Sequence, residues 1–527
     1  MEVSVLLQEL KNKQGIIPEN TSGEYSDEFC IQVKADEFRK TCLFLHKVLR
    51  APVAALFAVD ERPVRERFSL YCFFQGIKEK KWIQVKISIP AQDPRFESLA
   101  KDIYSASLFE REIKEMFGII PEGNPDQRRL NLHDEVWPEG HYPLNKDFKN
   151  AVSPEELKNI YQFIRVEGSG IFEVPVGPVH AGIIGPGHFR FSVAGEPIIN
   201  LEARLGFTHR GVEKLFEGKL ADETVGLAER VSGDSSFAHS LAFVRALEKI
   251  SGIQVSQQAL FLRGIFAELE RMYNHLSGIA GIALDVSFSF PATFAGILKE
   301  SVLQINSELC ASRYLKGINC LGGVKVDLSD SQVIALKDFL ENILLDFGDL
   351  EQILESSVSF MDRVDSTGIL KKKTAHDFGV VGLAARSSGI ALDLRKDFPG
   401  VYSLAKFKIS VQEAGDVLSR LNLRRLEFKE SVRLIGYFLD NLPARQDNRV
   451  PRFAYKEAGA LGYAEGWRGP VLYWVKTSGN GIIERCKIVD PSFHNWQGLT
   501  YAVLGDIIPD FPVSNKSFDL SYSGNDL

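Results

Sequence analysis

The hydrophobic positions of the first 150 residues predict a small α/β domain. Apolar residues recur at helical spacing over 36–49, and helical spacing returns over 97–117. Between these segments lie three runs rich in β-branched and aromatic residues, at 53–59, 68–74 and 82–89. Such runs are typical of β-strands. We therefore expect one domain over residues 1–150 that combines a sheet with helices.

A different pattern begins near residue 171 and predicts a helix bundle with a small antiparallel sheet. Alternating residues indicate a strand at 188–193, and the turn Gly195-Glu-Pro197 leads into a second strand at 198–204. Long amphipathic helices follow: one after a Ser256 N-cap, one from the capping box Ser329/Gln332 to about 364, and one over 411–442. Two further strands, 471–476 and 481–488, form a predicted hairpin. The fold class is therefore α+β, with this second domain over 171–527.

A linker over 151–170 separates the two predicted domains. It opens on Ser153-Pro-Glu-Glu156, where Ser, Pro and Glu occupy the positions typical of a helix start.

Composition and charge exclude several classes of protein. The 527 residues are 45% hydrophobic and 25% charged, as in ordinary globular proteins. A net charge of −7 argues against a nucleic-acid-binding protein. No run of about eighteen apolar residues is present, and the acidic start Met1-Glu2 does not resemble a signal peptide. We expect a cytoplasmic protein that could dock on a membrane without spanning it.

The cysteines do not predict a cluster of the protein's own. The six cysteines lie at positions 30, 42, 72, 310, 320 and 486, and no two of them have C-x-x-C spacing. Iron–sulfur clusters and zinc sites usually need thiolates paired closely in sequence. We expect six free thiols and no iron–sulfur cluster on this chain.

The most informative motif is Glu229-Arg-Val-Ser-Gly-Asp-Ser-Ser-Phe-Ala-His-Ser240, which has a partner in the last residues, Ser517 to Leu527. Together they resemble the metal-binding frame of the large subunit of energy-converting [NiFe] hydrogenases, and that of its relative, the quinone-site subunit of respiratory complex I. The resemblance places four thiolate ligands at Ser232, Ser235, Ser521 and Gly524. Because hydroxyls and a glycine replace soft thiolates, we expect no metal here.

Further motifs extend the resemblance along the chain. Gly177-Pro-Val-His180 with Gly187-His-Phe-Arg190 is similar to the formate-hydrogenlyase type of large subunit. Phe266 to Leu276 and Arg485 to Phe493 fit both relatives. In the first domain, segments 109–118, 124–130 and 141–148 resemble the 30-kDa subunit of complex I, with Glu115 and an additional Tyr142 as departures. That module is a scaffold, so Glu110, Arg111 and Glu112 are read as interface charges.

The resemblance also suggests candidate catalytic residues. Glu213 matches the proton-transfer glutamate of hydrogenases, while His180 and Asp285 match groups that act around the quinone headgroup in complex I. The two usual quinone donors are missing, because their positions fall on Ile184 and Gly233. We keep His180, Glu213 and Asp285 as a candidate proton or acceptor pocket. A first-turn helix acid paired with a neighbouring cation is the plainer interpretation of Glu213.

Other polar residues have two interpretations each. His188 and His239 could replace the missing quinone donors, although His239 is also compatible with a satisfied helix histidine. Glu268, Arg271 and His275 share one helix face, which indicates an internal ion-pair network or a subunit interface more than catalysis.

The roles of Asp234 and Leu527 also have more than one interpretation. Asp234 could bind a hard cation or act as an acid at a helix N-terminus. Leu527 stands where the complex I relative has arginine. We expect the mature chain to end there, with either a changed partner or a tail moved to the surface.

These observations lead to two functional hypotheses. In the first, the protein is a subunit of an ion-translocating oxidoreductase complex and reduces a quinone or another small acceptor. In the second, it is a non-catalytic subunit that couples an iron–sulfur subunit to antiporter-like membrane subunits. Both imply that the chain binds no cofactor except, in the first, quinone. Both also imply that the iron–sulfur cluster lies on a small partner subunit, and that the chain is peripheral on the inner face of the cell membrane.

Overall fold

The computed structural model describes residues 3–78, 80–149, 160–180, 184–444 and 454–527. Its mixture of helices and small sheets confirms the α+β class. The predicted helix start at Ser153 and most of the proposed linker lie outside the described residues.

The N-terminal domain is built on a five-stranded sheet with the order β1-β2-β5-β4-β3. All neighbouring strands are antiparallel except the parallel pair β2 and β5. The bounds are α1 Val3–Gln14, β1 Asn20–Ser22, β2 Glu28–Gln32, α2 Phe38–Leu49, β3 Val53–Asp60, α3 Arg62–Arg65, β4 Arg67–Gly76, β5 Lys81–Pro90, β6 Arg95–Glu97, α4 Ser107–Phe117 and β7 Ile120–Glu122. The predicted helix 36–49 and the three predicted strands are confirmed.

The predicted helix over 97–117 is too long. Residues 95–97 form strand β6, which pairs in parallel with β7, and only 107–117 are α-helical. The pairing joins segments that are distant in sequence, so local periodicity could not reveal it.

The second domain begins with the antiparallel sheet β10-β9-β8 and continues into long helices. The bounds are β8 Ile171–Val176, β9 His188–Ala194, β10 Ile198–Arg204, α5 Val212–Phe216, α6 Val225–Ala228, α7 Ser236–Ser251, α8 Gln257–Asp285, α9 Ser289–Cys310, β11 Asn319–Cys320, β12 Gly323–Val324, α10 Asp330–Ser356, α11 Val358–Val364 and α12 Lys372–Phe378. The chain then forms α13 Gly382–Ser387, α14 Leu394–Asp397, α15 Val417–Asp440, β13 Ala458–Glu465, β14 Pro470–Thr477, β15 Ile483–Val489, α16 Pro491–Ala502, α17 Phe511–Phe518 and α18 Tyr522–Asp526.

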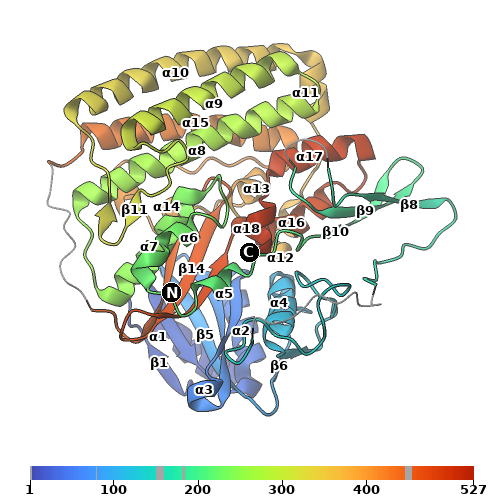
Figure 1. Ribbon diagram of the computed structural model, residues 1–527. Coiled ribbons are helices and arrows are strands. Elements are labelled where there is room, and N and C mark those ends of the chain that lie inside the picture. Colours follow the sequence, from blue (N-terminus) through green and yellow to red (C-terminus); the bar gives the residue numbers. More distant parts are fainter. Residues whose placement is uncertain (1–2, 79, 150–159, 181–183, 445–453) are drawn as a thin grey trace.

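Helix α8 is the axis of the bundle. It packs against α9 and α15 along its length, and α17 contacts it from the C-terminal end of the chain. Figure 1 shows α8, α9, α10 and α15 as nearly parallel layers above the sheets. Ser256 caps α8 as predicted, since its side chain accepts a hydrogen bond from the Ala259 N–H. Of the helices in the described ranges, none has an apolar stretch that would cross a bilayer.

Two helix predictions need correction. The helix that starts at the Ser329 capping box ends at Ser356, because Ser357 is extended and caps the separate helix α11. Helix α15 starts at Val417, capped by Asp416, and not near 411. The predicted hairpin is confirmed as β14 and β15, and β13 adds a third strand that the sequence did not indicate.

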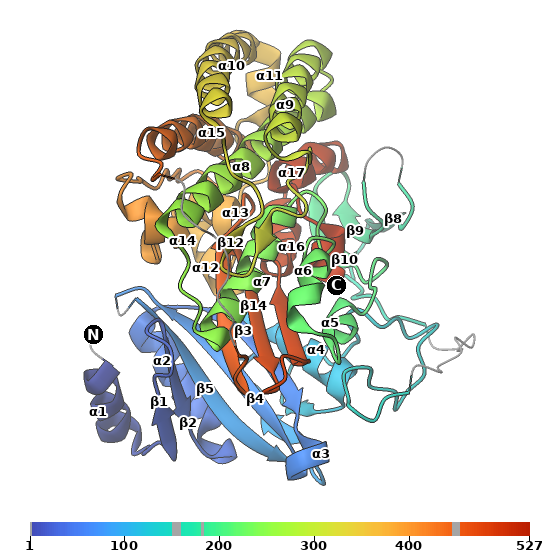
Figure 2. The same cartoon turned by 60° about the vertical axis from the view of Figure 1, so that its left-hand side comes forward.

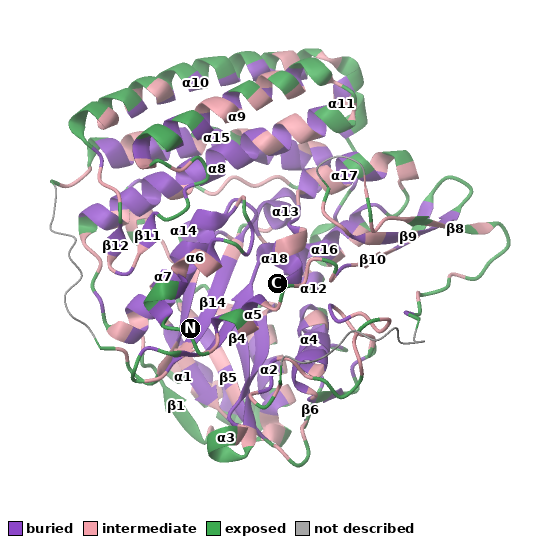
Figure 3. Ribbon diagram, in the orientation of Figure 1, coloured by how far each residue is buried: buried purple, intermediate pink, exposed green. Residues whose placement is uncertain are grey.

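The two domains share one core between their sheets. Trp474 of β14 packs on Phe57 and Tyr71 of the N-terminal sheet, with ring centroids 5.1 and 5.0 Å apart. Figure 2 shows the blue N-terminal strands directly beneath the orange strands of the second domain, and Figure 3 shows that the strands at this boundary are largely buried. Glu112 is an interface charge as predicted, because Lys487 lies 2.6 Å from it across this boundary.

Glu110 and Arg111 have a different role from the one predicted. Glu110 accepts hydrogen bonds from Ser98 and Asn124 inside the N-terminal domain, and Arg111 donates to the carbonyls of Arg128 and Arg129. Both residues fix loops of their own domain.

Candidate functional site

The fold brings together the four positions at which the resemblance places thiolates. Ser232 and Ser235 lie in the turn between α6 and α7, and Ser521 caps helix α18. The Oγ atoms of Ser232 and Ser521 are 2.8 Å apart. Ser521 Oγ also accepts the N–H of Gly524 at 2.9 Å. The two sequence segments, almost 290 residues apart, therefore meet through direct hydroxyl contacts.

An aspartate–arginine pair occupies the side of this centre that faces solvent. Asp234 accepts two hydrogen bonds from Arg468, at 2.8 and 2.6 Å, and one each from Ser232 and Ser235, at 2.9 and 3.0 Å. Desolvation would raise the pKa of Asp234, but the Arg468 guanidinium and the two hydroxyls outweigh it and hold this pKa well below its usual range. Asp234 is therefore ionised, and all of its strong interactions are with the protein.

A second acid lies beneath the centre, beside Gly524. A Cβ atom at Gly524 would lie 2.5 Å from Asp490 Oδ2, so the carboxylate takes the space that a longer side chain would need. Asp490 also contacts His239, whose Nε2 lies 3.0 Å from Oδ2 and whose Nδ1 lies 3.0 Å from the Tyr473 hydroxyl. His239 has no exposed surface. It is a satisfied helix histidine, and its ring nitrogens are not available to a quinone.

These donors do not fit a nickel–iron centre. Such metals are held by soft thiolates, whereas the four positions offer three neutral hydroxyls and a glycine. The Arg468 guanidinium, 3.3 Å from Ser235 Oγ, adds a positive charge where a cation would bind. In the described ranges no group of three or more His, Cys, Asp or Glu residues has metal-site geometry. The hypothesis that Asp234 holds a hard cation is not supported either, because Arg468 already neutralises it.

The structure places His180, Glu213 and Asp285 in three separate settings. His180 Nε2 lies 2.7 Å from the carbonyl oxygen of Gly187, next to the start of β9. Asp285 is exposed at the end of α8, and the nearest charges that affect it are Lys516 and Asp519. Within the described part of the chain, no contact joins these three side chains.

Glu213 is the most strongly held of the three. It is 4% exposed, and Arg485 and Lys487 lie 2.7 and 3.1 Å from its carboxylate. It also accepts the N–H of Ile488 at 2.9 Å. Burial would raise the pKa of Glu213, but the two cations outweigh it and lower this pKa. The interpretation as a helix acid paired with cations therefore fits, although the partners are Arg485 and Lys487 and not its sequence neighbours.

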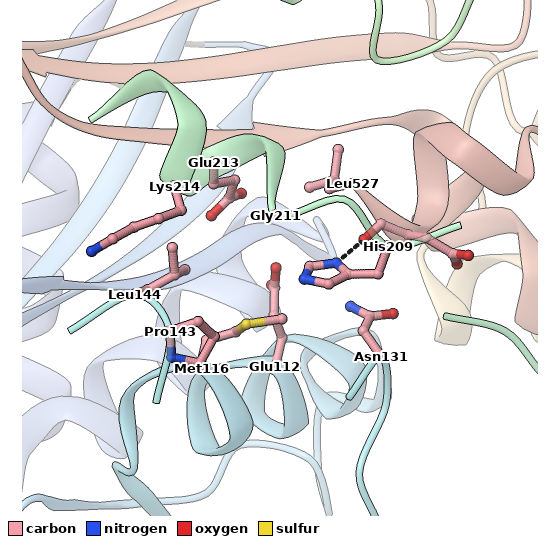
Figure 4. A pocket seen from close by; sticks show the side chains of 11 residues that line it. Glu112, Met116, Asn131, Pro143, Leu144, His209, Gly211, Glu213, Lys214 and Leu527 are labelled. Atoms are coloured by element: carbon pink, nitrogen blue, oxygen red, sulfur yellow. Dashed lines mark hydrogen bonds between the residues drawn. The ribbon is translucent and has the colours of Figure 1, made fainter. Parts of the chain in front are cut away.

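A small cavity lies between Glu213 and the N-terminal domain. Figure 4 shows Glu112, Glu213 and His209 around it, with the dashed contact from His209 to the Asp526 carbonyl. Its volume of about 20 Å³ has room for about one water molecule. The cavity is too small for a quinone headgroup.

The last residues of the sequence are buried around the same cavity. Leu527 is 7% exposed, and its backbone oxygen accepts the N–H groups of Arg210 and Val212 at 3.0 and 3.1 Å. Asp526 accepts two hydrogen bonds from Thr208, at 2.9 and 2.6 Å. The expectation of a tail moved to the surface is therefore wrong.

The polar face of α8 forms an internal ion-pair network, which confirms the first of its two interpretations. Glu268 lies 3.2 Å from both Arg271 and Arg395, and His275 lies 3.1 Å from Glu427. Arg386 continues the network by contacting Glu427, Glu465 and Asp393 at 2.8, 3.1 and 3.3 Å. The network connects α8 with α13, α14, α15 and β13.

Sequence reasoning missed the residues that close the centre. Arg468 lies in a glycine-rich segment where a single basic residue has no periodic signal, and its guanidinium stacks 3.9 Å from the Trp467 ring. Asp490 belongs to the motif that starts at Arg485, but its contact with Gly524 depends on a fold that joins distant segments.

Fold and site together define the class of protein: a fused, complex I-like subunit that joins a 30-kDa-type module to a hydrogenase-type large-subunit module. The family model of the respiratory-chain NADH dehydrogenase 30 Kd subunit matches residues 31–165, and that of the 49 Kd subunit matches residues 285–457. The chain belongs to this family of complex I and hydrogenase subunits.

Individual proteins of this family are similar to the chain over most of its length. Formate hydrogenlyase subunit 5 of Escherichia coli is 33% identical over 95% of this chain and 89% of the relative. The C/D subunit of the NADH-quinone oxidoreductase of Phocaeicola vulgatus is 30% identical over 73% of this chain and 78% of the relative. A chain of the membrane-bound sulfane sulfur reductase, an archaeal respiratory membrane complex, matches with a TM-score of 0.64 and 25% identity, covering 68% of this chain and 99% of that one.

Proposed function

We propose that this protein is a coupling subunit of a membrane-bound, ion-translocating oxidoreductase complex, without redox chemistry at the former metal position. The observation that supports the proposal best is the closed polar centre. Ser232 and Ser521 contact each other, and Arg468 and Asp234 neutralise each other above them. No residue of this centre is left as a soft ligand or as an activated nucleophile.

The ion-pair network favours a mechanical role. Arg386 and Arg395 tie the bundle helices α8 and α15 to the segment around Asp393, and Lys487 ties the second domain to Glu112 of the first. Buried, oppositely charged groups hold their positions firmly, because separating them would leave charges unpaired in a medium of low dielectric constant. A displacement at one end of the chain would therefore be transmitted across both domains.

The proposed partners and cofactors extend the resemblance found in the sequence. The chain binds no cofactor in this proposal, and electrons pass through an iron–sulfur cluster on a small partner subunit. Antiporter-like membrane subunits provide the ion path, and the protein sits peripherally on the inner face of the cell membrane. The names of the relatives, which include a quinone oxidoreductase and a respiratory membrane complex, support this setting.

A second candidate is the reduction of a small acceptor at the mouth of the centre. The side chain of Asp234 is 38% exposed and Gly233 is exposed, so solvent reaches the Asp234–Arg468 pair. The likeness to a sulfane sulfur reductase favours a small acceptor. A quinone is disfavoured because His239, which could have replaced its missing donors, is enclosed. In this alternative, Arg468 would have to release Asp234 to bind the acceptor.

Fractionation of native cells tests the proposed setting. The protein should sediment with membranes when its partners are present and copurify, after mild detergent extraction, with an iron–sulfur subunit and integral membrane proteins. Expressed alone, it should stay in the supernatant. Recovery of the native protein in the supernatant after gentle lysis would contradict the complex. The substitution Asp234→Asn then separates the two candidates when turnover is measured per assembled complex: coupling predicts that turnover falls only as far as less complex assembles, and acceptor reduction predicts a large loss in the complex that does assemble.

A further inference from the structure

A second cavity lies beside helices α7 and α8. It is enclosed by α7, α8, β13 and the segment 394–402, which continues from α14 into a 3₁₀ turn at Gly400–Ser403. Its volume is about 70 Å³. Since a water molecule needs about 10–15 Å³ of such internal space, the cavity has room for several waters or for one planar ion of a few heavy atoms.

Two arginines of this cavity have unused hydrogen-bonding capacity. Arg245 of α7 donates to the Tyr463 carbonyl at 2.8 Å, and among the described residues it has no carboxylate within ion-pair distance. Arg263 of α8 is 2% exposed and pairs with Glu248 at 2.6 Å, but its Nε–H has no partner. Burial and the proximity of Arg263 lower the pKa of Arg245, while Tyr463 and Glu248 oppose this effect. Arg245 therefore has nearby negative charge but no direct ion pair among the described residues.

The other charged groups of the wall are already balanced. Arg395 pairs with Asp393 and Glu268 at 2.7 and 3.2 Å. Glu465 pairs with Arg386 at 3.1 Å, and Glu270 accepts the N–H groups at the start of α7. Glu270 has no ion pair among the described residues, but burial raises its pKa to about 8, so this carboxyl is mostly neutral at pH 7. Of the described residues that line the cavity, Arg245 is therefore the one that keeps a charge without an ion-pair partner.

We propose that this cavity binds a small monocarboxylate of the size of formate or acetate. A carboxylate is planar and carries one negative charge, so it matches the fork of Arg245 and can also accept the free Nε–H of Arg263. Leu241, Leu260 and Ala267 supply an apolar wall suited to a methyl group. Pro399 and Val401 in the covering segment are partly exposed, so this segment lies between the cavity and solvent.

Binding of sodium acetate and sodium formate to the purified full chain tests the proposal. The melting temperature should rise with acetate or formate, and not with sodium chloride at the same ionic strength. Arg245→Met should weaken the apparent affinity by about thirtyfold or more, as expected when one partner of a buried charge pair is removed. Arg425→Met is the matched control, because Arg425 lies on α15 and pairs with Glu351 outside the cavity.

A second variant covers the case in which Arg245→Met does not fold. Ala267→Leu fills the cavity and leaves every charge in place, so it should abolish binding while Arg425→Met retains it. If the wild-type chain does not respond to either anion, or if Ala267→Leu binds acetate and formate as the wild type does, the proposal is wrong. The cavity then holds water.

Discussion

Replacing Arg386 by methionine is expected to lower the free energy of unfolding by about 3–5 kcal/mol, because breaking a buried ion pair leaves its partner charged and unpaired. Arg386 is fully buried and contacts the carboxylates of Glu427 and Glu465 at 2.8 and 3.1 Å. Methionine fills a similar volume but offers no charge to either acid. Urea unfolding followed by circular dichroism would measure the loss.

Arg425→Met is a control for the Arg386 prediction as well. Arg425 of α15 pairs with Glu351 and Glu355 on α10, and its side chain is 15% exposed. Because this pair is partly open to water and shared with the exposed Glu355, its loss should cost less than the loss of a fully buried pair. If Arg386→Met costs no more than this control, the buried network does not hold the bundle together as we propose.

Replacing Lys487 by methionine should weaken the contact between the two domains and lower the free energy of unfolding. Lys487 lies 2.6 Å from Glu112 of the N-terminal domain and 3.1 Å from Glu213 of the second. Its loss leaves Glu112 buried without a cation, at an expected cost of about 3–5 kcal/mol. Proteolysis should then cut the chain between the domains sooner than in the wild type, and urea unfolding would measure the loss.

The pH dependence of the Lys487→Met variant gives a second test. Burial raises the pKa of Glu112, and Lys487 opposes this effect. Without Lys487 the folded-state pKa rises further above the unfolded value, so the folded state takes up a proton at low pH and is destabilised by an ionised carboxylate at high pH. The deficit should therefore be larger at pH 8 than at pH 5. The double variant with Glu112→Gln should recover part of the loss, and no recovery would contradict the pairing.

The helices and strands that local chemistry specifies were predictable from the sequence. The predicted strand 188–193 is found as β9 because its residues alternate, and α8 starts after Ser256 because a serine cap precedes a periodic apolar run. Predictions failed where partners are distant. Residues 95–97 pair with 120–122, and the extended backbone of Ser357 divides a predicted helix into α10 and α11.

The sequence predicted which positions meet at the site, but it did not predict which side chains surround them. The motifs located Ser232, Ser235, Ser521 and Gly524, and the structure brings them together. Nothing in the sequence indicated that Arg468 would cover them, since no periodic pattern marks one arginine among glycines. Likewise, the resemblance identified His180, Glu213 and Asp285 as candidates, but only the three-dimensional structure shows that each has different partners.

Elemental analysis of the complex, purified from native membranes in mild detergent, tests the central claim most directly. Because three hydroxyls, a glycine and the Arg468 guanidinium occupy the position at which the resemblance places the metal, the preparation should contain no nickel, and all of its iron should be accounted for by the clusters of partner subunits. About one nickel per chain would contradict the account, since the residues of this centre would then bind the metal that their chemistry excludes.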